Sequence, residues 1–182
     1  MQLTAHEIIA IEDGAGRKLC SGVAVGDQRV LTAAHCLPGA QAIRRTDGSA
    51  VEFRVEERAK DTDAVALTAS VRSSPLACDG AGLALLRSGR PPCPVADAMH
   101  VGCTLEPGDS GSPLVDCDAG RARVVGVLSG LRQRGTEQWA TVAAVRALEP
   151  SGRPGAFGIA GIAAVLAVSL LVRRASRKSY PG

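Results

Sequence analysis

The hydrophobic positions of the chain fall into many short runs, and Gly, Pro, Asp and Ser separate one run from the next. Runs of this length, rich in Val, Ile, Leu and Thr and bounded by turn-forming residues, predict β-strands. Many such strands at this spacing are typical of an antiparallel sandwich or barrel. The predicted strands span residues 6–13, 18–26, 28–34, 40–45, 50–58, 64–69, 82–87, 112–118, 121–130 and 137–145.

The pattern changes after residue 149. Residues 150–155, "PSGRPG", have the composition of a flexible linker. Residues 156–172 carry no charge over 17 positions, which is the lower limit for a helix that spans a bilayer. A buried core helix is the alternative, but such a helix would show a polar stripe at helical spacing, and none is visible here. We therefore predict a transmembrane helix at 156–172.

The flanking charges orient this helix. The tail at 173–182 begins with a basic stretch, and basic residues next to an apolar span tend to stay in the cytoplasm. We expect a single-pass cell-membrane protein whose domain at 1–149 lies outside the cytoplasm. Residues 1–14 show no basic start followed by an apolar run, so they are not a signal peptide. An upstream start and another export route both stay open.

Composition and charge narrow the function. The chain has 182 residues, 46% of them hydrophobic and 2% aromatic, so its core is built from Val, Leu, Ile and Ala, which suit close-packed strands. The formal net charge is +3, but the tail beyond residue 155 contributes four basic residues and no acid, which leaves about −1 for the rest. No basic face for nucleic acid is indicated.

The six cysteines lie between residues 20 and 117, and none forms a CxxC pair of the zinc-ribbon type. An even number of cysteines without metal-ligand spacing favours an extracytoplasmic domain with disulfides. Six buried thiols in a cytosolic protein are the alternative. No cluster of metal ligands is visible, so neither a metal nor another cofactor is expected.

A base for catalysis can be sought among only three histidines. His6 lies in a predicted strand, His100 lies near a cysteine, and His35 follows an apolar strand in "LTAAHC". A base also needs a carboxylate to orient it, and "KDTDAVALT" offers Asp61 and Asp63. We choose Asp63, because it directly precedes an apolar strand where its side chain can be enclosed. An ordinary half-buried histidine and two loop-ending aspartates are the alternative interpretation.

The stretch "LEPGDSGSPLV" at 105–115 poses a similar choice. Pro, Gly and Asp are common turn formers, so a tight turn between two strands would explain it. If the turn is sharp, Gly108 lets the backbone approach a substrate carbonyl, and the N–H groups of Gly108 and Ser110 can point at one spot. That arrangement would be an oxyanion hole next to a nucleophile, Ser110.

Together, "LTAAHC", "DAVAL" and "PGDSGSPLV", in the order His, Asp, Ser, resemble the chymotrypsin family of serine proteases, especially small bacterial members such as the streptogrisins. The resemblance implies an all-β fold of two antiparallel six-stranded β-barrels with the site between them. It makes His35 the general base, Asp63 its orienting partner, Ser110 the nucleophile, and Gly108 with Ser110 the oxyanion donors.

The resemblance also extends to the cysteines. Cys20 and Cys36 resemble the family's disulfide beside the histidine, Cys103 and Cys117 would bracket the serine as a second, and Cys78 and Cys93 remain as a third pair by elimination only; all 15 connectivities are formally open.

Two departures from the family stand out. His35 and Ser110 are only 75 positions apart, so the second barrel is expected to be shortened. The "IVGG" start that in many members supplies an amino group to the aspartate before the nucleophile, here Asp109, is absent before residue 20. Either upstream sequence supplies that start, or Asp109 is held differently, or the oxyanion hole is poorly formed.

The resemblance places substrate contacts at Thr104, Ser129, Gly130 and Leu131. No acid lies where Lys or Arg would be recognised, and Leu131 would shorten the pocket, so we expect a small or medium apolar residue before the scissile bond. The sequence thus predicts a monomeric serine endopeptidase that cleaves proteins or peptides through an acyl-enzyme, tethered to the outer membrane face by its C-terminal helix. The alternative is a membrane-anchored pseudoprotease that binds peptides or proteins.

Overall fold

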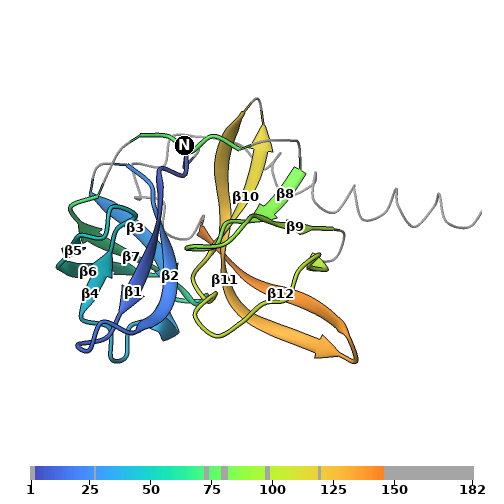
Figure 1. The fold of residues 1–182 in the computed structure, drawn as a ribbon, viewed down its shortest axis with the longest axis horizontal. Coiled ribbons are helices and arrows are strands. Elements are labelled where there is room, and N and C mark those ends of the chain that lie inside the picture. The colour runs from blue at the N-terminus through green and yellow to red at the C-terminus, as the bar shows by residue number, and fades with distance from the viewer. Residues whose placement is uncertain are drawn as a thin grey trace, which may run out of the picture. The chain divides into compact units, whose positions relative to one another are not determined.

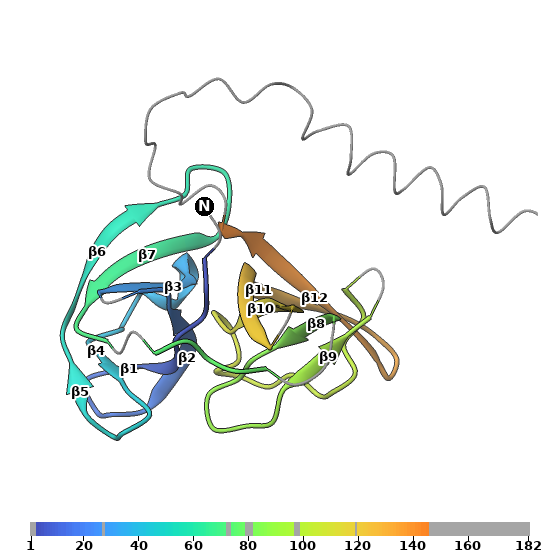
Figure 2. The ribbon, with the colours of Figure 1, turned by 90° about the horizontal axis from the view of Figure 1, so that it is seen from above.

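The computed structural model describes residues 3–26, 28–71, 74–78, 82–96, 99–118 and 120–145. These residues form two antiparallel β-sheets, with one short 3-10 helix, η1 (Ala34–Cys36), after the third strand. Figures 1 and 2 show the two sheets side by side, each of them curled. The fold is therefore all-β.

The first sheet is built from the N-terminal part of the chain. Its seven strands lie in the order β5-β4-β1-β2-β3-β7-β6, and consecutive hairpins account for most of the pairings. The strands are β1 (Glu7–Glu12), β2 (Lys18–Ala24), β3 (Arg29–Ala33), β4 (Ala42–Arg44), β5 (Ala50–Val51), β6 (Phe53–Arg58) and β7 (Ala64–Ala69).

The second sheet follows in the chain and has five strands in the order β12-β11-β10-β8-β9. Its longest strand is β11, which extends well past its pairing with β10 and continues into a hairpin with β12. The strands are β8 (Gly82–Leu85), β9 (Cys93–Val95), β10 (Pro113–Asp118), β11 (Arg121–Arg134) and β12 (Glu137–Ala144).

Each sheet has its own apolar core, and a third cluster joins them. Ile9, Ile11 and Leu67 are fully buried inside the first sheet, and Leu85 is fully buried inside the second. The joining cluster takes residues from both sheets and from the N-terminal segment. Burial of aliphatic side chains on both sides of this junction holds the two sheets together.

The N-terminal segment crosses from one sheet to the other. The N–H of Ala5 donates to the carbonyl oxygen of Ala122 (2.8 Å), and the N–H of Val124 donates to that of Leu3 (2.8 Å). Both bonds attach residues 3–5 to β11, and the chain then enters the first sheet as β1. Leu3 and Ala5 are buried in the joining cluster, so this segment links the sheets.

The predicted all-β fold with two antiparallel sheets is confirmed, and each predicted strand has a counterpart. The expected number of six strands in each barrel is wrong for the described residues, because these form one sheet of seven strands and one of five. The predicted strand at 50–58 is divided into β5 and β6, and β9 was not predicted. β9 has only three residues and includes Pro94, which makes a strand hard to recognise.

The predicted linker, transmembrane helix and basic tail, at 150–182, lie outside the described residues. Within the part of the chain that the structure does describe, no helix combines the length and the apolar character that crossing a bilayer requires.

Candidate active site

His35 and Asp63 are brought together by the pairing of β3 with β7. Ala33, the last residue of β3, pairs with Ala64, the first residue of β7, so the residues just beyond that pair face each other. The N–H of His35 donates to Asp63 Oδ1 (2.9 Å), and His35 Nδ1 lies 2.5 Å from Asp63 Oδ2. The same carboxylate therefore fixes both the backbone and the ring of His35.

A third donor reaches this carboxylate from the second sheet. The hydroxyl of Ser129, on β11, donates to Asp63 Oδ2 (2.8 Å). Burial on its own would raise the pKa of Asp63, but the hydrogen bonds from the His35 ring, the Ser129 hydroxyl and the His35 backbone outweigh it and leave the pKa below its ordinary value. Asp63 is therefore ionised at neutral pH and can stabilise a protonated His35.

A disulfide anchors the other side of His35. Cys36 is bonded to Cys20 on β2, with their Cα atoms 5.9 Å apart. A ring nitrogen of His35 and the two sulfurs all lie within 4.8 Å of one another, so the ring lies against the disulfide. Because both sulfurs are joined in this bond, they offer no thiolate to a metal ion.

Ser110 lies on two consecutive tight turns. The N–H of Asp109 donates to the carbonyl oxygen of Glu106, and the N–H of Ser112 donates to that of Asp109 (3.0 Å each). The third residue of each turn is a glycine with positive φ, Gly108 at 91° and Gly111 at 81°. Turns of this kind need glycine at that position, and they leave Ser110 at the second position of the second turn.

Contacts from both sheets hold this double turn. The N–H of Gly111 donates to the carbonyl oxygen of Leu128 (2.7 Å), and the N–H of Ser21 on β2 donates to that of Ser110 (2.8 Å). A Cβ at Gly111 would lie 2.1 Å from the carbonyl oxygen of Ser21 and 2.3 Å from Thr32 Oγ1, so no other residue fits there. The turn is therefore packed directly against β2.

Asp109, between the two glycines, is almost fully buried. Its Oδ2 accepts the N–H of Glu106 (3.0 Å) and lies 3.8 Å from Nη1 of Arg87 and from Nη1 of Arg90. Arg87 is itself buried and donates to the carbonyl oxygens of Thr104 (3.1 Å) and Pro91 (3.0 Å). Two guanidinium groups therefore face Asp109, for which the sequence had indicated no partner.

The charged surroundings of this turn include one more cation. The side chain of Lys18 packs over Gly108, with its Cε 3.5 Å from the place where a Cβ would be. Burial lowers the pKa of Lys18, the carboxylate of Asp109 partly opposes that effect, and Arg90 and Arg87 add to it. Three basic side chains, those of Lys18, Arg87 and Arg90, therefore surround the turn that carries Asp109.

Of the predicted site residues, the structure joins His35, Asp63 and Ser129 by hydrogen bonds. Ser110 lies on the turn attached to β2, where its carbonyl oxygen accepts the N–H of Ser21, the residue that follows Cys20 of the disulfide beside His35. Within the described ranges no hydrogen bond links the Ser110 hydroxyl to His35, and the N–H groups of Gly108 and Ser110 donate to none of the described residues. Asp61, the alternative to Asp63, makes no recorded contact with His35 there.

Residues 5–91 match the sequence model of the trypsin family, which is just under half of the chain. The chain is a serine-type peptidase. The matched residues contain β1 to β8, and with them His35 and Asp63. The predicted hydrolase is confirmed at this level.

Solved structures share the fold of the peptidase. One is described as the Rv3671c protease in an inactive form; it is 19% identical, with a TM-score of 0.54, and the match covers 82% of this chain and 89% of that one. Another is an inactive form of a serine-to-alanine mutant of Rv3671c from M. tuberculosis H37Rv, 18% identical, with a TM-score of 0.52 and coverages of 78% and 83%. Among curated proteins, none matches the chain.

The predicted disulfides of the second half of the peptidase are wrong. Cys103 is bonded to Cys93, with Cα atoms 5.6 Å apart, and not to Cys117. The predicted pair of Cys78 and Cys93 is excluded by the same bond. The reason is local: Val95 of β9 pairs with Val101, which folds the chain back and brings Cys103 beside Cys93. The disulfide beside His35 is present as expected.

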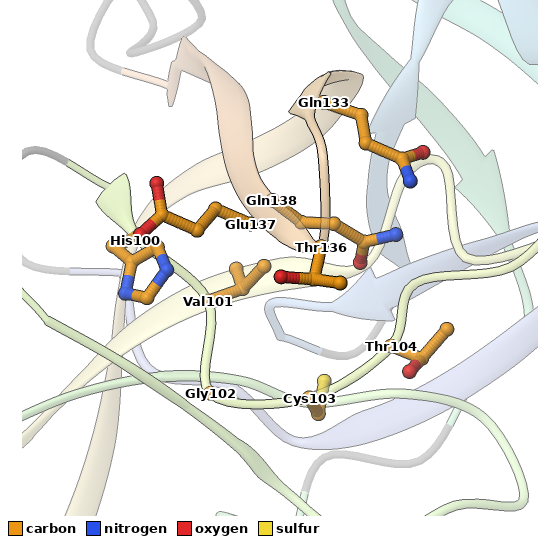
Figure 3. Close-up of a pocket in the computed structure, with 9 residues that line it drawn as sticks. All are labelled: His100, Val101, Gly102, Cys103, Thr104, Gln133, Thr136, Glu137 and Gln138. Carbon is orange, nitrogen blue, oxygen red and sulfur yellow. The ribbon is translucent and has the colours of Figure 1, made fainter.

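The predicted substrate contacts lie in two places. Ser129, Gly130 and Leu131 follow one another along β11, where Leu131 is 42% exposed. Thr104 lines a pocket of about 620 Å³ between the loop after β9 and the β11–β12 hairpin (Figure 3). The hairpin contributes mostly polar side chains to this pocket, namely Gln133, Thr136, Glu137 and Gln138.

Sequence reasoning missed the residues that support the turn. Arg87 ends an apolar run, and a buried charge at the end of a strand is the one signal that could have marked it. Ser21 gave no signal, because a small polar residue beside a cysteine is common. Only the pairing of β2 with the turn shows that Ser21 contacts it.

Proposed function

We propose that the peptidase is an endopeptidase that hydrolyses peptide bonds through an acyl-enzyme on Ser110. The observation that carries this proposal is the carboxylate of Asp63, which binds the His35 ring at Nδ1 and so leaves Nε2 as the nitrogen that can accept a proton. A base held in one tautomer is what a weak nucleophile such as a serine hydroxyl requires.

In the proposed reaction, Ser110 Oγ attacks the substrate carbonyl carbon while His35 Nε2 takes the hydroxyl proton. The negative charge on the former carbonyl oxygen is stabilised by the N–H groups of Gly108 and Ser110. His35 then gives its proton to the departing amine, the C–N bond breaks, and the acyl group stays on Ser110. Water, deprotonated by His35, releases the acid and restores the enzyme.

The test is covalent labelling. A fluorophosphonate probe should label the wild type, because an activated serine forms the bond, and should fail to label Ser110→Ala. Ser49→Ala, which removes an exposed hydroxyl bonded only within its own turn, should be labelled like the wild type. Labelling of Ser110→Ala at the wild-type rate would show that the probe reacts elsewhere and would overturn the assignment.

The alternative function, a pseudoprotease that binds peptides, has one observation in its favour. Ser110 makes no hydrogen bond to His35 among the described residues. In proteins without substrate, however, such catalytic contacts are often long and tighten only when substrate binds. A folded wild type that binds peptides but shows neither labelling nor turnover would select this alternative.

We further propose that the apolar segment at 156–172 tethers a monomeric peptidase to the outer face of the cell membrane, with protein or peptide substrates. This proposal rests on the uncharged length of the segment and on the basic residues that follow it. The proposed likeness to the streptogrisins rests on the motifs "LTAAHC", "DAVAL" and "PGDSGSPLV". The preference for an apolar residue before the scissile bond rests on Leu131 and competes with the polar pocket beside Thr104.

A further inference from the structure

Ser21 contacts the nucleophile's turn at two points. Its N–H donates to the carbonyl oxygen of Ser110 (2.8 Å), and its hydroxyl donates to the carbonyl oxygen of Gly108 (2.9 Å). Ser21 has no solvent exposure, and the Thr32 hydroxyl donates to its own carbonyl oxygen (2.7 Å). One residue of β2 therefore holds both ends of the segment from Gly108 to Ser110.

These two ends are the residues whose N–H groups stabilise the oxyanion in the proposed reaction. Gly108 has a positive φ and no side chain, so its conformation depends on what its peptide groups contact. The bond from Ser21 Oγ fixes the Gly108 carbonyl, and with it one of the two peptides that meet at Gly108. The other peptide carries the Gly108 N–H, and its orientation relative to the first depends on φ and ψ of Gly108. Without the bond from Ser21, only the turn bond from the Asp109 N–H to the carbonyl oxygen of Glu106 holds the first peptide, so Gly108 has more freedom to turn its own N–H away from the oxyanion.

We infer that Ser21 is a positioning residue for the oxyanion hole, acting through Gly108. The inference rests on the proposed function of Ser110. It concerns the hydroxyl of Ser21 alone, because both Ala and Thr at this position keep the backbone N–H that donates to Ser110. Ser21 does not touch the substrate. Its contribution should therefore appear in the rate of the chemical step and not in the binding of the probe.

The experiment measures saturable labelling by the fluorophosphonate probe in the full chain, which separates the maximal rate of bond formation from the probe concentration at half-maximal rate. Ser21→Ala removes one buried hydrogen bond and no packing volume beyond one oxygen atom, so it should fold. Its maximal rate should fall about 3- to 10-fold, the range that one such hydrogen bond accounts for, with the half-maximal concentration unchanged.

Two further variants separate positioning from general weakening. Ser21→Thr keeps the hydroxyl and should retain most of the wild-type rate. Ser49→Ala removes a hydroxyl bonded to Asp47, far along the chain from the turn, and should label at the wild-type rate. All rates are compared at a temperature where circular dichroism shows every variant to be folded. Removing a hydroxyl that only stabilises the fold would lower the melting temperature without changing the labelling rate of the folded protein.

The outcomes distinguish this inference from the proposed function. An unlabelled wild type overturns the proposed function and, with it, the role of Ser21. A wild type labelled at Ser110, together with a folded Ser21→Ala variant whose maximal rate stays within twofold of it, overturns the role of Ser21 only. If the Thr variant does not fold, the comparison of Ser21→Ala with Ser49→Ala still decides the question.

Discussion

At the scale of single residues, Asp63 joins the two halves of the site. It accepts hydrogen bonds from the backbone and ring of His35, which lie next to β3, and from Ser129 on β11 of the other sheet. These bonds lower its pKa against the opposing effect of burial. An ionised carboxylate shared in this way orients the His35 ring and also links the sheets.

Replacing Asp63 by Asn should therefore abolish most of the activity without unfolding the protein. The amide is close in size but can present its N–H₂ group to the ring, which favours the wrong tautomer of His35, so kcat should fall about 10³- to 10⁴-fold. The measurement is the labelling rate at Ser110 or the turnover of a protein substrate. Asp61→Asn is the matched control, and equal losses in both variants would contradict the choice of Asp63.

The wild type and the Asp63→Asn variant should also differ in their stability towards acid. Because the pKa of Asp63 is lower in the folded state than in the unfolded chain, its contribution to stability is present above the unfolded value of about 3.9 and is lost as the pH falls through the lower folded value. Urea unfolding should show that the free energy of unfolding falls less between pH 6 and pH 3 for Asp63→Asn than for the wild type.

At the scale of secondary structure, the turn that carries Ser110 is supported by two parts of the chain. β2 contributes Ser21, and the segment after β8 contributes Arg87 and Arg90, which face Asp109. The first described residues pair with β11 and lie in the joining cluster. Among the described residues, the ion-pair partners of Asp109 are thus the side chains of Arg87 and Arg90.

Arg87→Met should destabilise the protein and slow labelling at Ser110. The methionine keeps much of the apolar stem but leaves Asp109 with a weaker cationic partner and two carbonyl oxygens without a donor, so the free energy of unfolding should fall by about 3 kcal/mol. The measurement is denaturant unfolding together with the labelling rate. In the control, Arg17→Met removes an exposed ion pair with Asp13 and should lower the free energy of unfolding much less than Arg87→Met does.

How far the sequence could predict these elements depended on the range of the interactions. Strands such as β3 and β7 were predictable, because their own residues carry the pattern, and the motifs that follow them located His35 and Asp63. The disulfide of Cys93 was not predictable, because it depends on how the chain folds back after the short strand β9. The roles of Ser21 and Arg87 depend on contacts between residues about 20 to 90 positions apart, which leave no local pattern.

At the scale of the whole domain, neither sheet holds the complete site. His35 and Asp63 follow strands of the first sheet, whereas Ser110 and Ser129 belong to the second part of the chain. The joining cluster and the N-terminal segment at 3–5 hold the sheets against each other. Activity should therefore be lost when the packing of the two sheets is lost.

The full chain should fractionate with membranes when it is expressed in a bacterial host. The reason is the uncharged segment at 156–172, which is long enough to span a bilayer. A variant without residues 156–172 should move to the soluble fraction and keep its labelling at Ser110. Recovery of the full chain in the soluble fraction, in a form that labels normally, would contradict the proposed tether.

The disulfide between Cys20 and Cys36 has a consequence for where the enzyme can work. Cys36 adjoins His35, and Cys20 adjoins Ser21, which holds the turn of Ser110, so one covalent bond supports both partners of the proposed proton transfer. Glutathione and thioredoxin keep such cysteines reduced in the cytosol. In a reducing compartment, His35 and the turn of Ser110 would thus both lack this shared covalent support, so the activity of the peptidase should rise when the disulfide forms.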